Sequence, residues 1–254
     1  MKKTIVSFVL SLMFPLALFA DGYTSLWKQF DEADSKDLPK TQIKILNKII
    51  AQAKADKSYG NLLKAEFDKV VLASDISDEM FQSELSALKK AAGEASAIDP
   101  ALAAVYNCAL GRGYALSAKS SRKSNIKKLS REYFDKALAD PGMLASKKAL
   151  DYAPFVCKGV DSEIFGNDLL SLIGYYSERY ALLNDYYNKA GNRRASLVTA
   201  LWMLERRVKV NPVKKVIKGN TYLASLDSLV ALYGDLKECG EVAIAKYDYM
   251  ADCQ

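Results

Sequence analysis

The chain has 254 residues, of which 50% are hydrophobic and 26% charged, with a formal net charge of +6 and no histidine. Such a composition is typical of a globular protein with a sizeable core. The lack of histidine excludes Ser-His-Asp and Cys-His catalysis as well as histidine-assisted zinc sites. The positive charge is mild and evenly spread, and it gives no indication of nucleic-acid binding.

Residues 1–20 have the three-part layout of a secretory signal peptide. An uncharged apolar run from Ile5 to Phe19 follows two lysines and ends at Ala20, before Asp21. This run is shorter than the about 20 apolar residues that a transmembrane helix needs. We therefore predict cleavage after Ala20 and export to the periplasm or cell envelope. No cysteine follows the run, so acylation as a lipoprotein has no acceptor there.

The mature chain, residues 21–254, contains no second apolar run long enough to span a bilayer. We expect it to be soluble or held peripherally at the envelope. Removing Lys2 and Lys3 lowers its formal charge from +6 to +4.

Apolar residues recur at helical spacing through most of residues 21–254, which predicts an all-α fold. Three stripes illustrate the pattern: Ile43, Leu46, Ile50 and Ala53; Leu197, Ala200, Leu201, Leu204 and Val208; and Leu226, Leu229, Val230 and Tyr233. Strict two-residue alternation is missing, which argues against a sheet.

Start and stop signals divide the mature chain into about ten or eleven helices. Three helix beginnings and one break are predicted: Asp37 before Pro39, Asp75 with Ser77 ahead of Asp78 and Glu79, Asp99 before Pro100, and a break at Asp140-Pro141-Gly142. Short links such as residues 56–58 and 191–192 favour antiparallel hairpins.

Three segments share the pattern of an apolar helix, a tight polar turn and a second apolar helix. They are residues 45–67, 180–198 and 229–247. The last two superpose through Gly191 and Gly240 with an offset of 49 residues, whereas a tetratricopeptide array repeats about every 34. We therefore predict an irregular, tetratricopeptide-like stack of helical hairpins, with a hinge near residues 151–168.

Two motifs resemble ligand sites only in part. Gly111-Arg112-Gly113 lacks the preceding strand and the third glycine of a phosphate-binding loop. Asp161, Glu163 and Asp168 offer oxygen ligands but lack the spacing and closing glutamate of a calcium loop. We interpret Asp161, Glu163 and Asp168 as solvated loop acids. We predict no catalytic, cofactor or metal site in the chain.

Cys239-Gly240-Glu241 matches the start of the internal thioester sequence Cys-Gly-Glu-Gln, but Val242 replaces the glutamine, so no thioester can form. We instead place these residues at the turn of the final hairpin, with Gly240 ending one helix and Glu241 beginning the next.

Tyrosines and basic residues each allow two interpretations. Tyr176, Tyr180, Leu183 and Tyr187 follow helical spacing, and such a stripe either lines a ligand groove or fills helix contacts; we favour the second. The basic segment consists of Lys119, Arg122, Lys123, Lys127, Lys128 and Arg131. It either contacts an acidic partner or membrane surface or is a solvated connection between two helices, which we favour.

The four cysteines are too few and too far apart for a small disulfide scaffold. Cys108 and Cys157 lie among apolar residues, so we interpret both as buried free thiols. Cys239 and Cys253 are a candidate pair if the last helix folds back on its partner.

Several phrases resemble the N-terminal helical region of bacterial alpha-2-macroglobulin-like proteins. They are Tyr23-Thr24-Ser25-Leu26-Trp27-Lys28-Gln29, Lys158-Gly159-Val160-Asp161-Ser162, Asp185-Tyr186-Tyr187-Asn188-Lys189, Gly191-Asn192-Arg193-Arg194 and Gly240-Glu241-Val242-Ala243-Ile244. Family members trap proteases with β-sandwich macroglobulin domains, a bait segment and often a thioester, all absent from these 254 residues.

The resemblance implies a non-catalytic helical leader, present as a fragment or degenerate copy. The apolar face of the last helix, with Ile244, Tyr247 and Ala251, has no polar capping repeat, which led us to expect that the reading frame once continued. The alternative is a free-standing module that binds a protein or peptide in the envelope. An enzyme that uses carboxylates alone is the least favoured class, and the binding residues are not identified by sequence.

Overall fold

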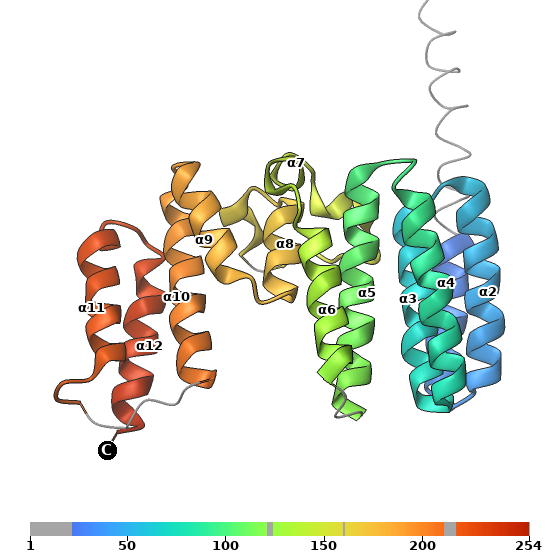
Figure 1. Ribbon diagram of the computed structural model, residues 1–254, viewed down its shortest axis with the longest axis horizontal. Coiled ribbons are helices and arrows are strands. Elements are labelled where there is room, and N and C mark those ends of the chain that lie inside the picture. The colour runs from blue at the N-terminus through green and yellow to red at the C-terminus, as the bar shows by residue number, and fades with distance from the viewer. Residues whose placement is uncertain (1–21, 121–123, 160, 211–216, 254) are drawn as a thin grey trace, which may run out of the picture. The chain divides into compact units, whose positions relative to one another are not determined.

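The computed structural model describes residues 22–120, 124–159, 161–210 and 217–253, and most of them are helical (Figure 1). Residues 22–34 are helical and precede α2. The α-helices that follow are α2 (Pro39–Asp56), α3 (Tyr59–Ile76), α4 (Asp78–Ala95), α5 (Pro100–Ser120), α6 (Ser124–Ala137), α7 (Pro141–Ala145), α8 (Leu169–Tyr176), α9 (Tyr180–Lys189), α10 (Arg193–Val210), α11 (Thr221–Tyr233) and α12 (Cys239–Ala251). Two 3-10 helices, η1 (Ala149–Tyr152) and η2 (Ser162–Phe165), lie between α7 and α8.

The prediction of an all-α fold is confirmed, since no strand forms among these residues. The sole β-type pairing within the described ranges is an isolated bridge between Lys148 and Asp168. None of the helices described has the length and apolar character that crossing a bilayer requires. The signal peptide predicted for residues 1–20 lies outside the described residues.

The chain forms two compact units. The first comprises residues up to Tyr133 together with Leu150–Cys157, and the second comprises Phe134–Ala149 together with the residues from Lys158 onward. The predicted hinge segment, residues 151–168, is therefore divided between the units after Cys157.

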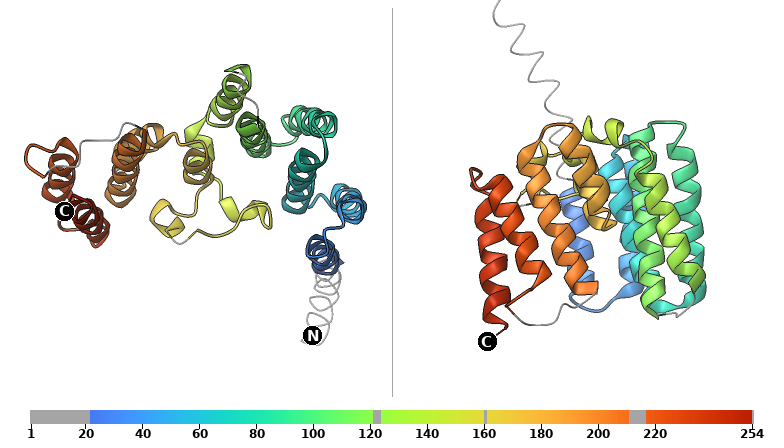
Figure 2. Two further views of the ribbon diagram at one scale, coloured as in Figure 1. Left: turned by 90° about the horizontal axis from the view of Figure 1, so that it is seen from below. Right: turned by 60° about the vertical axis from the view of Figure 1, so that its left-hand side comes forward.

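In the first unit, α2 to α5 are antiparallel neighbours, and Figure 2 (left) shows them nearly end-on. Two helix starts follow the predicted capping signals. Ser77 accepts a hydrogen bond from the backbone N–H of Met80 at 3.2 Å and caps α4. Asp99 accepts one from the N–H of Ala101 at 2.9 Å at the start of α5. A capping oxygen satisfies a backbone donor that has no partner within its own helix.

The start of α2 is placed correctly by the sequence, but its cap is not Asp37. Leu38 precedes Pro39 at the N-cap position without a side-chain cap, and Asp37 has a φ of 50° in the left-handed region. Proline suits the first helical position because its missing N–H would have no helical partner there. The break predicted at Asp140 lies between α6 and α7. Asp140 caps α7, because its side chain accepts a hydrogen bond from the backbone N–H of Met143 at 2.9 Å.

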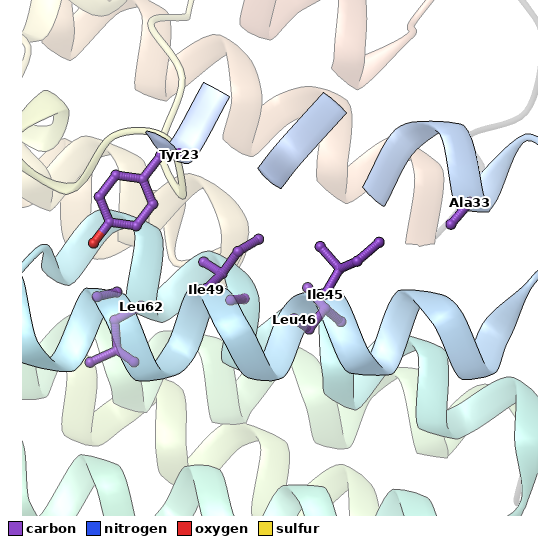
Figure 3. Close-up of a cluster of buried hydrophobic side chains, with 8 residues drawn as sticks. Tyr23, Ala33, Ile45, Leu46, Ile49 and Leu62 are labelled. Atoms are coloured by element: carbon purple, nitrogen blue, oxygen red, sulfur yellow. The ribbon is translucent and has the colours of Figure 1, made fainter. Parts of the chain in front are cut away.

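The core of the first unit begins with the contact between residues 22–34 and α2 (Figure 3). Tyr23 and Ala33 pack with Ile45 and Ile49, which are at most 7% exposed. Ile43 and Ile50, two members of the predicted stripe, are only half-buried. Leu46 and Ala53, the other two members, are buried as predicted. The buried face of α2 therefore overlaps the predicted stripe but extends toward Ile45 and Ile49, because helices pack on α2 from two sides.

In the second unit, α9, α10, α11 and α12 form two antiparallel pairs joined by side-chain caps and ion pairs. Asn220 caps α11 by accepting hydrogen bonds from the N–H groups of Tyr222 and Leu223 at 2.9 and 3.1 Å. Leu197, Leu201 and Leu226 are buried in one cluster between α10, α11 and α12. The same side of α10 continues into a groove, because Leu197 and Leu201 line it together with Val198 and Trp202.

Candidate functional site

An open groove of about 410 Å³ runs along α10 in the second unit. Its floor is apolar and consists of Ile164, Leu197, Val198, Leu201 and Trp202. The four floor residues of α10 lie at i, i+1, i+4 and i+5, which places them on one face of the helix, so the sequence of a single helix provides most of the apolar surface. Figure 1 shows α10 between α9 and α12.

Trp202 is held in an aromatic cluster at one wall of the groove. Its indole stacks on Phe165 with ring centroids 5.4 Å apart and an interplanar angle of 27°. Tyr175 and Tyr180 contact the same indole at 5.1 and 5.6 Å between centroids. Offset and edge contacts of this kind add stability beyond apolar burial. The cluster therefore gives the groove a fixed wall, contributed by η2, α8, α9 and α10.

Three consecutive residues at the start of α10 fix both sides of the groove. Asn192 accepts a hydrogen bond from the N–H of Ala195 at 3.1 Å and donates one to the carbonyl of Ile164 at 2.9 Å, which ties η2 to α10. Arg193 donates two hydrogen bonds to the carboxylate of Asp235, at 2.6 and 2.8 Å. Bidentate pairing of this kind defines the geometry as well as the energy of the contact.

Arg194 donates from its Nε to Glu238 at 2.7 Å, and Glu238 is only 8% exposed. The hydrogen bond from Arg194 lowers the pKa of Glu238, so this carboxyl stays charged and paired. Together Arg193 and Arg194 hold the turn between α11 and α12 against α10. This turn forms the second wall of the groove.

The rim of the groove is predominantly acidic. It comprises Asp161, Glu163, Glu205, Glu238 and Glu241, with Arg194 and Lys237 as the cations. Glu238 is paired with Arg194, and Glu163 with Lys158 at 2.7 Å. Partial desolvation and the nearby negative charge of Glu241 raise the pKa of Glu205. Two like charges on α10 and α12 thus face the same part of the groove.

The glycine-rich fragment at residues 111–113 lies inside α5 and not in a loop. The carbonyl of Gly111 accepts a hydrogen bond from the buried hydroxyl of Ser130 at 2.7 Å. A Cβ at Gly113 would lie 2.8 Å from the Leu85 side chain. The missing side chain of Gly113 therefore serves helix packing, and this fragment forms no phosphate-binding loop.

The acids of the predicted loop have different roles. Asp168 is buried, caps α8 by accepting from the N–H of Ser171 at 2.8 Å and accepts from the hydroxyl of Tyr187 at 2.7 Å. It is therefore not a solvated loop acid, which corrects our interpretation. Asp161 and Glu163 are exposed and belong to the groove rim. Within the described ranges, no three His, Cys, Asp or Glu side chains group as metal ligands would.

Cys239, Gly240 and Glu241 all lie in the first turn of α12, because α11 already ends at Tyr233. The prediction that Gly240 ends the preceding helix is wrong: five residues separate the two helices, and Gly240 is helical. As a consequence Glu241 projects from α12 onto the groove rim.

The predicted tyrosine stripe belongs to two helices. Tyr176 is the last residue of α8 and is 47% exposed, whereas Tyr180, Leu183 and Tyr187 lie in α9. Leu183 and Tyr187 are buried, which agrees with the helix-contact interpretation for them. The contribution of the tyrosines to the groove comes through Tyr180 and Tyr175, which contact Trp202. The groove itself has one signal in the sequence, which is the spacing of Val198, Trp202 and Glu205 on one helix face.

The basic segment is not a free connection between helices. Lys127, Lys128 and Arg131 are exposed residues of α6. Lys119 belongs to α5, and Arg122 and Lys123 lie outside the described residues. The exposed part is a solvated helix face, and no further cluster of ligand-type residues accompanies it among the residues described.

The cysteines are free thiols. Cys108 is buried as predicted, but Cys157 is exposed, since its neighbours contribute to the core and its own side chain does not. The pairing considered for Cys239 and Cys253 does not form. Cys239 is the first residue of the 13-residue helix α12 and Cys253 lies two residues after its end, so the helix separates them by roughly 20 Å, whereas the Cα atoms of a disulfide are at most about 7 Å apart.

We predict that alkylating reagents distinguish these thiols. Burial raises the pKa of Cys108 to about 12, so almost none of it is thiolate at pH 8. Brief treatment of the folded chain with iodoacetamide should modify Cys157 first and Cys108 at least about 100-fold more slowly. Peptide mass spectrometry with and without urea measures both rates, and a Cys157→Ser variant serves as the control. Equal rates in the folded chain would contradict the buried position of Cys108.

Comparison of the chain with protein-family models, with curated proteins and with solved structures gives no match.

Proposed function

We propose that this protein is a non-catalytic, exported helical module that binds a segment of a protein or peptide. The observation that carries the proposal is the groove along α10, which combines an apolar floor with a charged rim. Grooves between helices are recurrent sites for polypeptide ligands, because an apolar floor supplies affinity and a polar rim supplies orientation. The export part of the proposal rests on residues 1–20, and the hairpins are proposed to be tetratricopeptide-like in their local packing.

The proposal of a non-catalytic role is supported by how the groove side chains are used. Glu238 and Glu163 are engaged in ion pairs with Arg194 and Lys158. No histidine exists in the chain, so the usual general base at neutral pH is lacking.

A random-peptide display selection on the purified chain tests the binding function. We expect peptides enriched on the wild type to bind about tenfold more weakly to Trp202→Ala, because truncation removes the centre of the aromatic wall. Met203→Ala is the matched control on the same helix, since Met203 is 38% exposed and does not line the groove. No enrichment over an empty support, or equal losses in the two variants, would contradict the proposal. Circular dichroism of each variant checks that it is folded.

A second candidate function is the helical leader of an alpha-2-macroglobulin-like protein. It is favoured by the positions of the resembling phrases at contacts between helices. The hydroxyl of Tyr23 donates a hydrogen bond to Asp56 and the indole of Trp27 donates one to Asn61, both at 2.8 Å. Residues 192–194 fix the walls of the groove. In that case the partner is a folded domain, and stable binding of isolated macroglobulin-type domains without binding of short peptides would favour it.

A further inference from the structure

The charge of the groove is opposite to the charge of the whole chain. Five acidic and two basic side chains line the groove, which gives it a formal charge of 2 − 5 = −3, whereas the complete sequence carries +6. Most of the cationic charge inside the groove is already engaged, because Arg194 is paired with Glu238. A second cation, Lys237, lies 4.0 Å from the same carboxylate.

Ion pairs between described residues engage Glu163 and Glu238 of the groove, but not Asp161, Glu205 on α10 or Glu241 on α12. Glu205 and Glu241 come from different helices and both line the groove. Desolvation raises the pKa of Glu205, and the negative charge of Glu241 raises it further. Like charges that approach each other on a folded surface raise its energy, and a cation between them removes the repulsion. The aromatic wall at Trp202 lies on the same helix, one turn before Glu205.

We infer that the groove selects a basic polypeptide segment, whose lysine or arginine head group lies at Glu205 and Glu241 while apolar stems and neighbours cover the floor. The inference rests on the proposed function and names the chemistry of its ligand. Long basic side chains suit such a site because their methylene stems pack on apolar surface while the charged end stays at the rim. An aromatic wall further favours cations over anions.

Other occupants fit the observations less well. An acidic or phosphorylated segment would bring further negative charge to a rim whose acids already outnumber its cations. A metal ion has only two adjacent carboxylates available, and no group of three potential ligands occurs in the described part of the chain. A small amine would satisfy Glu205 and Glu241 but would leave the floor residues Val198 and Trp202 uncovered.

Three labelled peptides of identical length and apolar content provide the probes: one carries lysine and arginine, one glutamine and one glutamate at the same positions. Fluorescence anisotropy against the full purified chain should show tightest binding of the basic peptide. Glu205→Gln combined with Glu241→Gln should weaken that peptide about tenfold and leave the glutamine peptide within about twofold. Reversal of both residues to lysine should transfer the preference to the glutamate peptide.

The matched control replaces two exposed acids of the same unit that do not line the groove, Asp185→Asn with Asp248→Asn. It changes the net charge by the same amount, and the affinity for the basic peptide should change less than about twofold. An equal loss in this control, or no loss in the groove variant, overturns the inference. If the glutamine or glutamate peptide binds best and Trp202→Ala abolishes its binding, the groove binds peptides but not basic ones. If none of the three binds and display selection also fails, the proposed function itself is wrong.

Discussion

Replacing Gly60 with alanine is expected to destabilise the first unit by about 3 kcal/mol. Gly60 lies in the first turn of α3, and a Cβ there would be 1.9 Å from the carbonyl oxygen of Ala153 and 2.8 Å from the carbonyl carbon of Tyr152. These are backbone atoms of the segment Leu150–Cys157, so no rotamer change relieves the overlap. The segment has to move away, and the Phe67–Phe155 ring contact, 5.9 Å between centroids, is weakened with it.

The two tryptophans make this effect measurable in one unit at a time, since Trp27 belongs to the first unit and Trp202 to the second. Urea unfolding followed by Trp27 fluorescence in a Trp202→Phe background reports the first unit. Gly93→Ala is the matched control: Gly93 is an exposed residue of α4 with no atom within 4 Å of a built Cβ. There alanine should stabilise by about 0.5–1 kcal/mol because it lowers the entropy cost of helix formation. A stabilising effect at both positions would show that α3 does not contact residues 150–157 closely.

The helical class and most helix beginnings were predictable because their causes are local. Ser77 and Asp99 hydrogen-bond to N–H groups within three residues, and the short links after Asp56 and Lys189 leave the chain no alternative to reversal. Contacts between distant segments have no such signal. Nothing near Gly60 in the sequence indicates that a segment about ninety residues later covers it.

The helix faces were predicted less well, because a stripe in one helix does not specify which neighbour covers it. On α2, Leu46 and Ala53 are buried as predicted. Ile45 and Ile49 are buried in place of Ile43 and Ile50, since both residues 22–34 and α3 pack on α2. The groove has the same explanation. Its rim joins segments that are far apart in the sequence. Asn192 ties η2 to α10, whereas the ion pairs of Arg193 and Arg194 and the apolar cluster between α10, α11 and α12 hold the last hairpin there.

Replacing Asp168 with alanine is expected to destabilise the second unit by about 3 kcal/mol. The substitution removes the cap of α8, a loss of about 1 kcal/mol. It also leaves the buried hydroxyl of Tyr187 without its acceptor, which costs about 1–3 kcal/mol. Tyr187 contacts Phe165 at 5.3 Å between ring centroids, and Phe165 stacks on Trp202, so the loss reaches the groove wall. Trp202 fluorescence during urea unfolding in a Trp27→Phe background measures it.

Asp168→Asn separates the hydrogen bonds from the charge. Asparagine caps a helix about as well as aspartate, and its amide can still pair with Tyr187, so we expect a loss below about 1 kcal/mol at pH 7. A loss as large as that of the alanine variant would show that the charge of Asp168, and not its hydrogen bonds, stabilises this corner.

The pH dependence of the free energy of unfolding, compared between the wild type and Asp168→Asn, tests how burial acts on Asp168. Burial raises the pKa of Asp168, and this outweighs the hydrogen bonds from Tyr187 and Ser171 that lower it. A folded-state pKa above the unfolded value means that the folded chain binds the proton more tightly, so this contribution to stability is present at low pH and is lost as the pH rises through the raised pKa. The wild type should therefore gain free energy of unfolding relative to Asp168→Asn as the pH is lowered from 7 to 4. A relative loss over this range would mean that the carboxylate is stabilised in the folded state by its hydrogen bonds and by Lys148 more than it is destabilised by burial.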